Sequence, residues 1–289
     1  AFRQLEAVTE SVVVRHNVYA SLLLNSLCCY DFHCVRRYCK WKNTYRHVFA
    51  SWLEAVGTAE ALISLGVPAR TRQTHTMPVI LDTDKPSISA DCLQHPLILE
   101  TDAVGNNFHL MHQTCIITGS NMSGKTTFMR SIGINLILAY AGGFCTARGL
   151  HVSCMEVCTS IRTADNVSEG ISTFYAEILR IKSMIEISQK QQPMLCLIDE
   201  IYKGTNSKDR IYAARETVKN LAKPYTATIL TTHDMELCDL EQEPGMDAEN
   251  YYFMEHYEKE QILFDYKIRI GRCTTANARH LLRMAGILQ

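Results

Sequence analysis

The sequence predicts an α/β fold of the phosphate-loop class, with a mostly parallel sheet, an antiparallel edge, flanking helices and a preceding helical fragment. Three observations predict it. Residues 119–126, GSNMSGKT, match the pattern G-x-x-x-x-G-K-[ST] at every fixed position. The apolar run 194–198 ends in Asp199-Glu200, and a second strand-like run, 225–232, ends in His233. Continuous apolar runs of strand length are typical of parallel strands that are buried on both faces.

Composition narrows the class of protein before any motif is considered. The 289 residues carry 29 basic and 30 acidic side chains, a formal charge of −1, so no general attraction to nucleic acid or anionic membrane is expected. The 12 cysteines are scattered without paired C-x-x-C spacing, which indicates reduced thiols in a cytoplasmic protein. No uninterrupted run of about 18 apolar residues is present, so no membrane association is expected. The chain begins with Ala in a helix-like stretch, and we interpret it as part of a longer protein.

The chain is predicted to contain a helical fragment, a linker and one large domain. Residues 1–66 lack proline and space their apolar residues as two or three helices do. An aromatic and basic cluster at 30–42 is open to two interpretations, a nucleic-acid contact or a solvated helix face with aromatic rings packed beneath it; we favour the second. Prolines and aspartates concentrate in 67–96, which places a linker at 67–89 and the domain at 90–289.

The expected elements of the domain follow in order. A strand at 115–118 leads into the phosphate loop, and a helix at 127–140 follows it. After Gly142-Gly143, strands are expected at 144–147 and 156–161, then a helix from 172–173 to about 189. The strand 194–198, a helix at 208–221 and the strand 225–232 complete the parallel part. An edge hairpin is expected at 251–255 and 262–270, and a final helix at 275–285.

The phosphate loop has a defined chemistry. Its glycines allow backbone N–H groups to point at phosphate oxygens, and the following helix adds its positive end. Lys125 would reach the β- and γ-phosphates, and the hydroxyl of Thr126 would be a ligand of Mg²⁺. The expected nucleotide-binding residues are Gly119, Ser120, Asn121, Met122, Ser123, Gly124, Lys125, Thr126 and Thr127.

Polar residues at the strand ends predict the second half of a hydrolytic site. Asp199 would hold Mg²⁺, through water, as the corresponding acid does in phosphate-loop enzymes. Glu200 would act as general base on the attacking water. His233, at the end of a neighbouring strand, would sense the γ-phosphate or orient that water. Ser172 precedes a helix, where the sequence by itself indicates only an ordinary helix cap.

Together these motifs resemble the MutS-type ATPase domain of the ABC superfamily. The resemblance rests on 119–127, on DNVSEGISTF at 165–174, on LIDEI at 197–201 with Gly204-Thr205, and on TTHD at 231–234, and it covers about residues 90–289. Residues 1–66 resemble the end of the helical core and lever region that precedes this domain. The resemblance implies ATP and Mg²⁺ as ligands and a homodimer in which Ser172 and Thr173 complete the partner's site in trans. It also implies that the full-length protein forms a DNA-embracing clamp in mismatch repair or a related process.

Departures from the family pattern indicate a divergent branch. Ser120 stands where mismatch repair members usually have proline, and Tyr202-Lys203 stands where they typically have glycine-arginine. The sequence Phe253-Met254-Glu255 matches the family's mismatch-reading Phe-x-Glu only by coincidence, because it lies on the late hairpin. No clear match exists for the aromatic residue that stacks on adenine, and 104–108 is the region in which to look for it.

Two other classes remain open. A transporter-type ABC ATPase would carry Leu-Ser-Gly-Gly-Gln before the acidic strand, and that pentapeptide is absent. A nucleotide-dependent switch or scaffold would bind ATP with little turnover. The intact Glu200 and His233 argue against such a protein.

Overall fold

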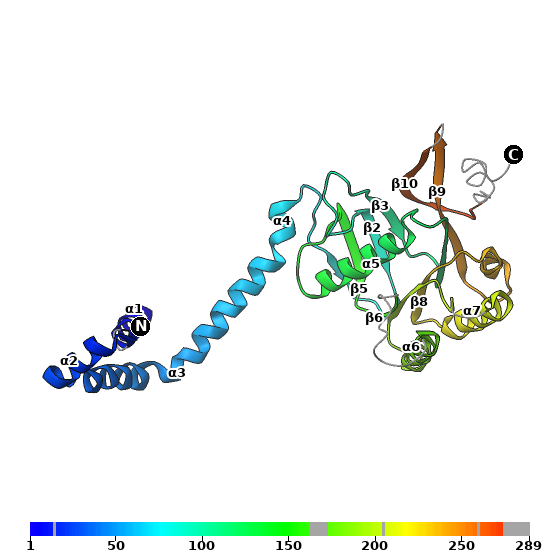
Figure 1. Cartoon of the computed structure of the whole chain (residues 1–289). Helices are drawn as coiled ribbons and strands as arrows, with labels where there is room; N and C mark the ends of the chain where they lie inside the picture. Colours follow the sequence, from blue (N-terminus) through cyan, green and yellow to red (C-terminus); the bar gives the residue numbers. More distant parts are fainter. Residues whose placement is uncertain (14–15, 162–172, 204–205, 259–260, 274–289) are drawn as a thin grey trace. The chain divides into compact units, whose positions relative to one another are not determined.

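The structure, a computed structural model, confirms the α/β fold class (Figure 1). It describes residues 1–13, 16–161, 173–203, 206–258 and 261–273. The chain forms two compact units, Ala1–Ser64 and Leu65–Gln289. The predicted helix at 275–285 lies outside the described residues.

The first unit is helical, as its apolar spacing predicted. It contains α1 (Phe2–Val13), α2 (Val18–Cys28) and most of α3 (Tyr30–Leu65). Asn17 caps α2 by accepting a hydrogen bond from the amide of Ala20 at 3.2 Å. In the 30–42 cluster, Trp41 is half-buried and packs against Tyr45, with ring centres 6.0 Å apart. The basic side chains of the cluster are exposed, which agrees with a solvated helix face: Arg36, Arg37, Lys40 and Lys42.

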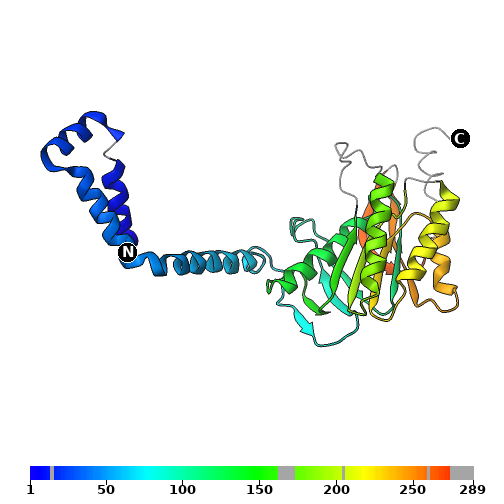
Figure 2. The ribbon, with the colours of Figure 1, turned by 90° about the horizontal axis from the view of Figure 1, so that it is seen from below.

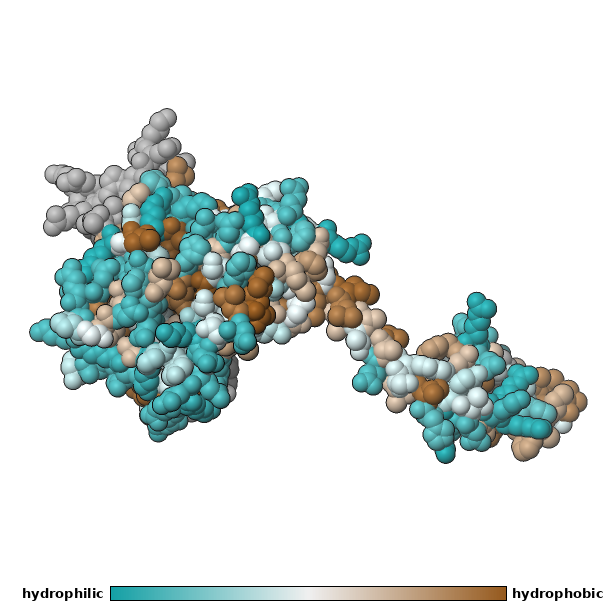
Figure 3. Space-filling model, turned by 180° about the vertical axis from the view of Figure 1, so that it is seen from behind, coloured by the Kyte–Doolittle hydropathy of each residue, from teal (hydrophilic) through white to brown (hydrophobic). Residues whose placement is uncertain are grey.

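Helix α3 is long and apolar enough to cross a membrane by length and composition, with an 18-residue window of mean hydropathy 1.3 that is not buried in the structure. It nevertheless carries Glu54 and Glu60, and a charged side chain within a bilayer costs about 3 kcal/mol. Apolar side chains also lie on the surface of both units (Figure 3).

The second unit contains two sheets and their flanking helices. Its elements are α4 (Val67–Thr71), β1 (Val79–Leu81), β2 (Ile88–Leu93), β3 (Asn106–His109), β4 (Thr114–Thr118), α5 (Lys125–Tyr140), β5 (Gly149–Ser153), β6 (Glu156–Ser160), α6 (Thr173–Ser188), β7 (Met194–Asp199), α7 (Ser207–Leu221), β8 (Thr226–Thr231), the 3₁₀ helix η3 (Met235–Gln242), β9 (Ala248–Glu258) and β10 (Gln261–Ile270). A smaller sheet has the order β1-β5-β2-β3, and the larger sheet has the order β10-β9-β4-β8-β7-β6. All pairs in the larger sheet are parallel except β10 with β9, which confirms the predicted antiparallel edge.

Both faces of the larger sheet are covered (Figures 1 and 2). Along β7, Leu195 and Leu197 pack in the cluster that contains α5 and the smaller sheet. The alternate residues Cys196 and Ile198 pack against α6, α7 and η3. Because successive side chains of a strand point to opposite faces, a strand covered on both sides must be apolar throughout. The apolar run at 194–198 has this physical cause.

One predicted strand is wrong. Residues 144–147 were expected to form a strand, but the strand after α5 is β5 at Gly149–Ser153. The segment 144–147 makes only an isolated bridge, between Thr76 and Cys145. Its Thr146 instead donates from its amide to Asn135 Oδ1 on α5 at 2.7 Å. The apolar character of this segment reflects burial against α5, a signal that burial in a strand also produces.

Candidate functional site

The carboxyl ends of three adjacent strands carry the predicted site residues. Strand β8 lies between β4 and β7, and Thr231 at its end is in register with Ile117 on one side and Asp199 on the other. The phosphate loop follows β4, Asp199-Glu200 closes β7, and His233 follows β8. Parallel strands end at the same edge of a sheet, so three segments far apart in sequence meet there.

The glycines of the phosphate loop have positive φ angles, which residues with a Cβ atom rarely adopt. Gly119 has φ +145° and Gly124 has φ +108°. A Cβ atom on Gly119 would lie 2.8 Å from the carbonyl oxygen of Phe253 and 2.9 Å from Ser123 Oγ. The loop therefore folds tightly against β9, which leaves its concave side to the ligand.

Lys125 begins α5 and is 5% exposed. Its ammonium donates to the carbonyl oxygens of Gly119 at 2.8 Å and Ser120 at 2.7 Å. Burial lowers the pKa of Lys125 to about 8, partly offset by the negative charge of Asp199. A buried ammonium that donates to two neutral carbonyl oxygens keeps a positive charge available to an anionic ligand.

The side chains of Thr126 and Asp199 lie together and present oxygen atoms of the hard type that Mg²⁺ prefers. The Thr126 hydroxyl donates to both carboxylate oxygens of Asp199, at 3.0 and 3.1 Å, and the Thr231 hydroxyl also donates to Asp199. No cluster of three or more His, Cys, Asp and Glu side chains suited to a metal occurs among the described residues. Two protein oxygens fit Mg²⁺, which keeps several waters and takes further oxygens from a bound phosphate.

Glu200 lies at the centre of a charged group. Its Oε1 is 2.5 Å from His233 Nε2, and its Oε2 contacts the ammonium of Lys203. The Glu200 side chain is 14% exposed. Burial lowers the pKa of His233 below its usual value, and the nearby Lys125 and Lys203 lower it further. This direction favours the neutral imidazole, and Nε2 carries the hydrogen that faces the Glu200 carboxylate, because an ionised carboxylate only accepts hydrogen bonds.

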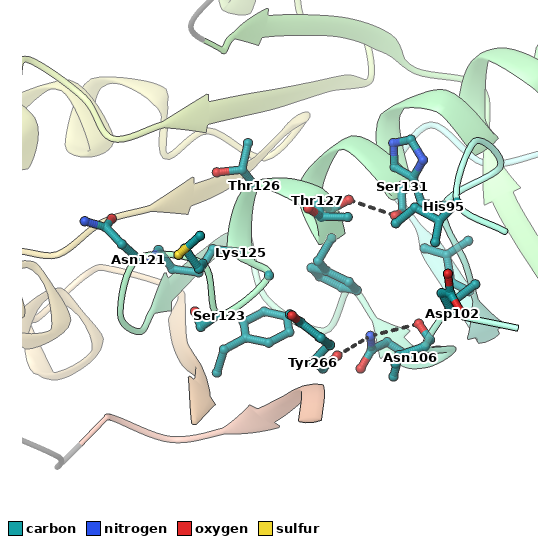
Figure 4. A pocket seen from close by; sticks show the side chains of 18 of the residues that line it. His95, Asp102, Asn106, Asn121, Ser123, Lys125, Thr126, Thr127, Ser131 and Tyr266 are labelled. Carbon is teal, nitrogen blue, oxygen red and sulfur yellow. Dashed lines mark hydrogen bonds between the residues drawn. The ribbon is translucent and has the colours of Figure 1, made fainter. Parts of the chain in front are cut away.

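A cavity of about 600 Å³ extends from the phosphate loop towards β3 and β10 (Figure 4). Besides loop residues Asn121 and Ser123, it is lined by Glu200 and by residues that the sequence did not indicate, including His95, Asp102 and Tyr266. Of the region 104–108, Val104 and Asn106 line the cavity, whereas Phe108 is buried in the core. The Asn106 amide donates to the Tyr266 carbonyl at 3.0 Å, which joins the two walls. No sequence signal identifies Tyr266, because it lies 160 residues from Asn106 and joins it only in the fold.

The departures from the family pattern make specific contacts. The Ser120 hydroxyl donates to the carboxylate of Glu255 on β9, a contact that proline does not make. Phe253 and Glu255 are buried within the domain, which agrees with a coincidental Phe-x-Glu. Tyr202 has φ +59°, a left-handed conformation in which glycine is favoured.

Some predicted residues remain outside this description. Ser172 and Gly204-Thr205 lie outside the described residues. Thr173 is the first residue of α6, and its side chain is not described.

The parallel sheet, the phosphate loop and the acidic strand end define a phosphate-loop nucleotide-binding domain. The family model for MutS domain V matches residues 115–289, and the chain belongs to the MutS family.

Curated relatives agree with this membership. The chain is 32% identical over 249 residues to a DNA mismatch repair protein MutS of Protochlamydia amoebophila, which covers 82% of the chain and 28% of the relative. It is 30% identical over 243 residues to the MutS of Carboxydothermus hydrogenoformans, and this match covers 81% of the chain and 28% of the relative. It is 30% identical over 218 residues to DNA mismatch repair protein MutS 2 of Halobacterium salinarum, and this match covers 71% of the chain and 25% of the relative. The chain thus spans about a quarter of the length of these relatives.

Proposed function

We propose that this chain is the Mg²⁺-dependent ATPase domain, with an adjoining helical core or lever fragment at 1–66, of a divergent MutS-family protein. It hydrolyses ATP to ADP and phosphate. In the full-length protein, the reaction drives a dimeric DNA-binding clamp in mismatch repair or a related repair or recombination process. A cytoplasmic location is supported by the 12 cysteines, which are scattered along the sequence without paired C-x-x-C spacing.

One observation carries the proposal: the Thr126–Asp199 pair and the Glu200–His233 pair lie at the same sheet edge as the phosphate loop. Phosphoryl transfer requires a phosphate cradle, a Mg²⁺ site and a residue that positions water. A phosphate loop that only bound nucleotide would need neither Glu200 nor its histidine partner.

The residues divide the reaction between them. The loop amides and Lys125 bind the phosphates, and Thr126 and Asp199 would hold Mg²⁺, which neutralises charge that develops on the phosphate oxygens. Glu200 accepts a proton from the attacking water as its oxygen bonds to the γ-phosphorus and the bond to the β–γ bridging oxygen breaks. His233, whose pKa is lowered by burial, keeps the Glu200 carboxylate oriented through the contact at Nε2. The part of the cavity that is lined by Val104, Asn106 and Tyr266 provides space for the adenine of ATP.

The proposed dimer completes each site with Ser172 and Thr173 from the partner, as the family resemblance implies. The printed names of the relatives describe DNA mismatch repair, which supports DNA as a partner of the full-length protein.

The test is ATP hydrolysis as a function of protein concentration, with and without mismatched or branched DNA, for the wild type and a Ser172→Ala variant. Specific activity that rises with concentration and falls when Ser172 is lost supports a composite dimeric site. Activity independent of both would refute the dimeric mechanism. Stimulation by one DNA form over the other assigns the repair process.

A second candidate, a nucleotide switch with little turnover, is favoured by one observation. Lys203 already contacts the Glu200 carboxylate, and a base held by a cation is a weaker base. The two candidates differ in turnover. A switch would bind ATP and change conformation, yet hydrolyse it no faster than the Glu200→Gln variant.

A further inference from the structure

A buried hydrogen bond connects the turn that follows β7, residues 200–203, to helix α6. Glu177 Oε1 on α6 accepts from the backbone amide of Tyr202 at 2.7 Å. Glu177 is 7% exposed and Tyr202 is 6% exposed. A hydrogen bond to a carboxyl oxygen that is buried away from water is strengthened by the low local dielectric.

Contacts of this kind stabilise the turn, whose backbone is strained at two residues. Glu200 has φ +52° and Tyr202 has φ +59°. A side chain disfavours this left-handed region, because its Cβ atom approaches the following carbonyl oxygen. Without compensating contacts, the turn would relax and carry the Glu200 carboxylate away from His233.

The side chain of Tyr202 supplies two such contacts. Its ring packs edge-on against Phe174 of α6, with centres 6.0 Å apart. Its hydroxyl forms a hydrogen bond of 3.0 Å with the Thr217 hydroxyl on α7. Tyr202 therefore joins α6, α7 and the strand end of β7, a role that glycine at this position would not perform.

We propose that Glu177 and Tyr202 are positioning residues that tie the turn bearing Glu200 to the N-terminal half of α6. The inference rests on the proposed hydrolytic function. Helix α6 begins at Thr173, which with Ser172 is proposed to act in the partner's site. A shift of the start of α6 is thereby transmitted to the chain's own Glu200, which links the two sites of a dimer.

The experiment compares Glu177→Ala and Glu177→Gln in the full 289-residue chain. Glutamine keeps an oxygen that accepts from the Tyr202 amide, whereas alanine does not. Glu186→Ala is the matched control, because Glu186 lies on the same helix in an exposed pair with Lys182. Thermal unfolding confirms that each variant folds. The two readouts are hydrogen exchange at the Tyr202 amide and steady-state ATP hydrolysis.

In Glu177→Ala, we expect exchange at Tyr202 to rise at least tenfold and kcat to fall about 10- to 100-fold, with KM within twofold. Glu177→Gln restores most of both, and Glu186→Ala changes neither. Tyr202→Phe and Thr217→Val each remove the same hydrogen bond and give equal, smaller losses of kcat.

Unchanged exchange or unchanged kcat in Glu177→Ala would overturn the inference, as would a loss that Glu177→Gln does not rescue. Failure of the proposed hydrolytic function can be distinguished from failure of the positioning role of Glu177. A wild type that turns over ATP no faster than Glu200→Gln would refute hydrolysis, while the exchange measurement still decides whether Glu177 holds the turn.

Discussion

Nε2 of His233 lies 2.5 Å from Oε1 of Glu200, although the two residues end different strands and are 33 positions apart in the chain. The pair forms because β7 and β8 are parallel neighbours whose carboxyl ends coincide. It gives Glu200 a fixed orientation beside the phosphate loop, and four predictions follow from this site.

Glu200→Gln should bind ATP and scarcely hydrolyse it. Glutamine keeps the size of the side chain but cannot accept the proton of the attacking water, so kcat should fall about 100-fold or more. ATP affinity, measured by titration with a fluorescent analogue, should stay within a few-fold. Glu216→Gln, an exposed change on α7, is the control. Unchanged turnover in Glu200→Gln would remove Glu200 as the base.

Lys125→Ala should abolish tight ATP binding. The change removes a buried cation, and the loss of charge-assisted hydrogen bonds to phosphate costs about 2–3 kcal/mol, or roughly 30- to 150-fold in affinity. Calorimetric titration measures it, with the exposed Lys182→Ala as control. Normal affinity in Lys125→Ala would refute the phosphate-loop assignment.

ATP binding should weaken above pH 8. The pKa of Lys125 is lowered to about 8, so in the free protein it loses its proton as pH rises through this value. ATP requires the protonated form, so the apparent Kd should be about tenfold higher at pH 9 than at pH 7. In a Lys125→Arg variant the guanidinium stays charged, and the pH dependence should disappear. A wild-type Kd that is constant from pH 7 to 9 would contradict the role of the lysine charge.

Gly119→Ala should destabilise the domain and weaken ATP binding together. Its Cβ would lie 2.8 Å from the Phe253 carbonyl at φ +145°, at a cost of about 2–3 kcal/mol in the free energy of unfolding. Gly142→Ala is the control that separates backbone strain from steric collision, because Gly142 has φ +76° but no atom lies within 4 Å of an added Cβ. This change should lower the free energy of unfolding by only about 1 kcal/mol. Urea unfolding measures both. Equal losses would show that collision with β9 is not what requires glycine at position 119.

Prediction from sequence was most successful where one local signal has one physical cause. The pattern at 119–126 specifies a loop between strand and helix, because only glycine tolerates its backbone and only a lysine there reaches the phosphates. Prediction was wrong at 144–147, where burial without strand pairing leaves the same apolar signal. The roles of Ser172 and Thr173 remain predictions, since they depend on a second copy of the chain.

The sequence by itself determined the fold class, the phosphate loop and the acidic end of β7, because these features depend on residues close together along the chain. The tertiary structure alone decided that Glu200 contacts His233, that Tyr266 faces Asn106, and that Glu177 accepts a hydrogen bond from the amide of Tyr202. These contacts depend on strand order and helix packing, which bring distant segments together. No local pattern of residues records which strands become neighbours, so the arrangement of the site appears only in the folded domain.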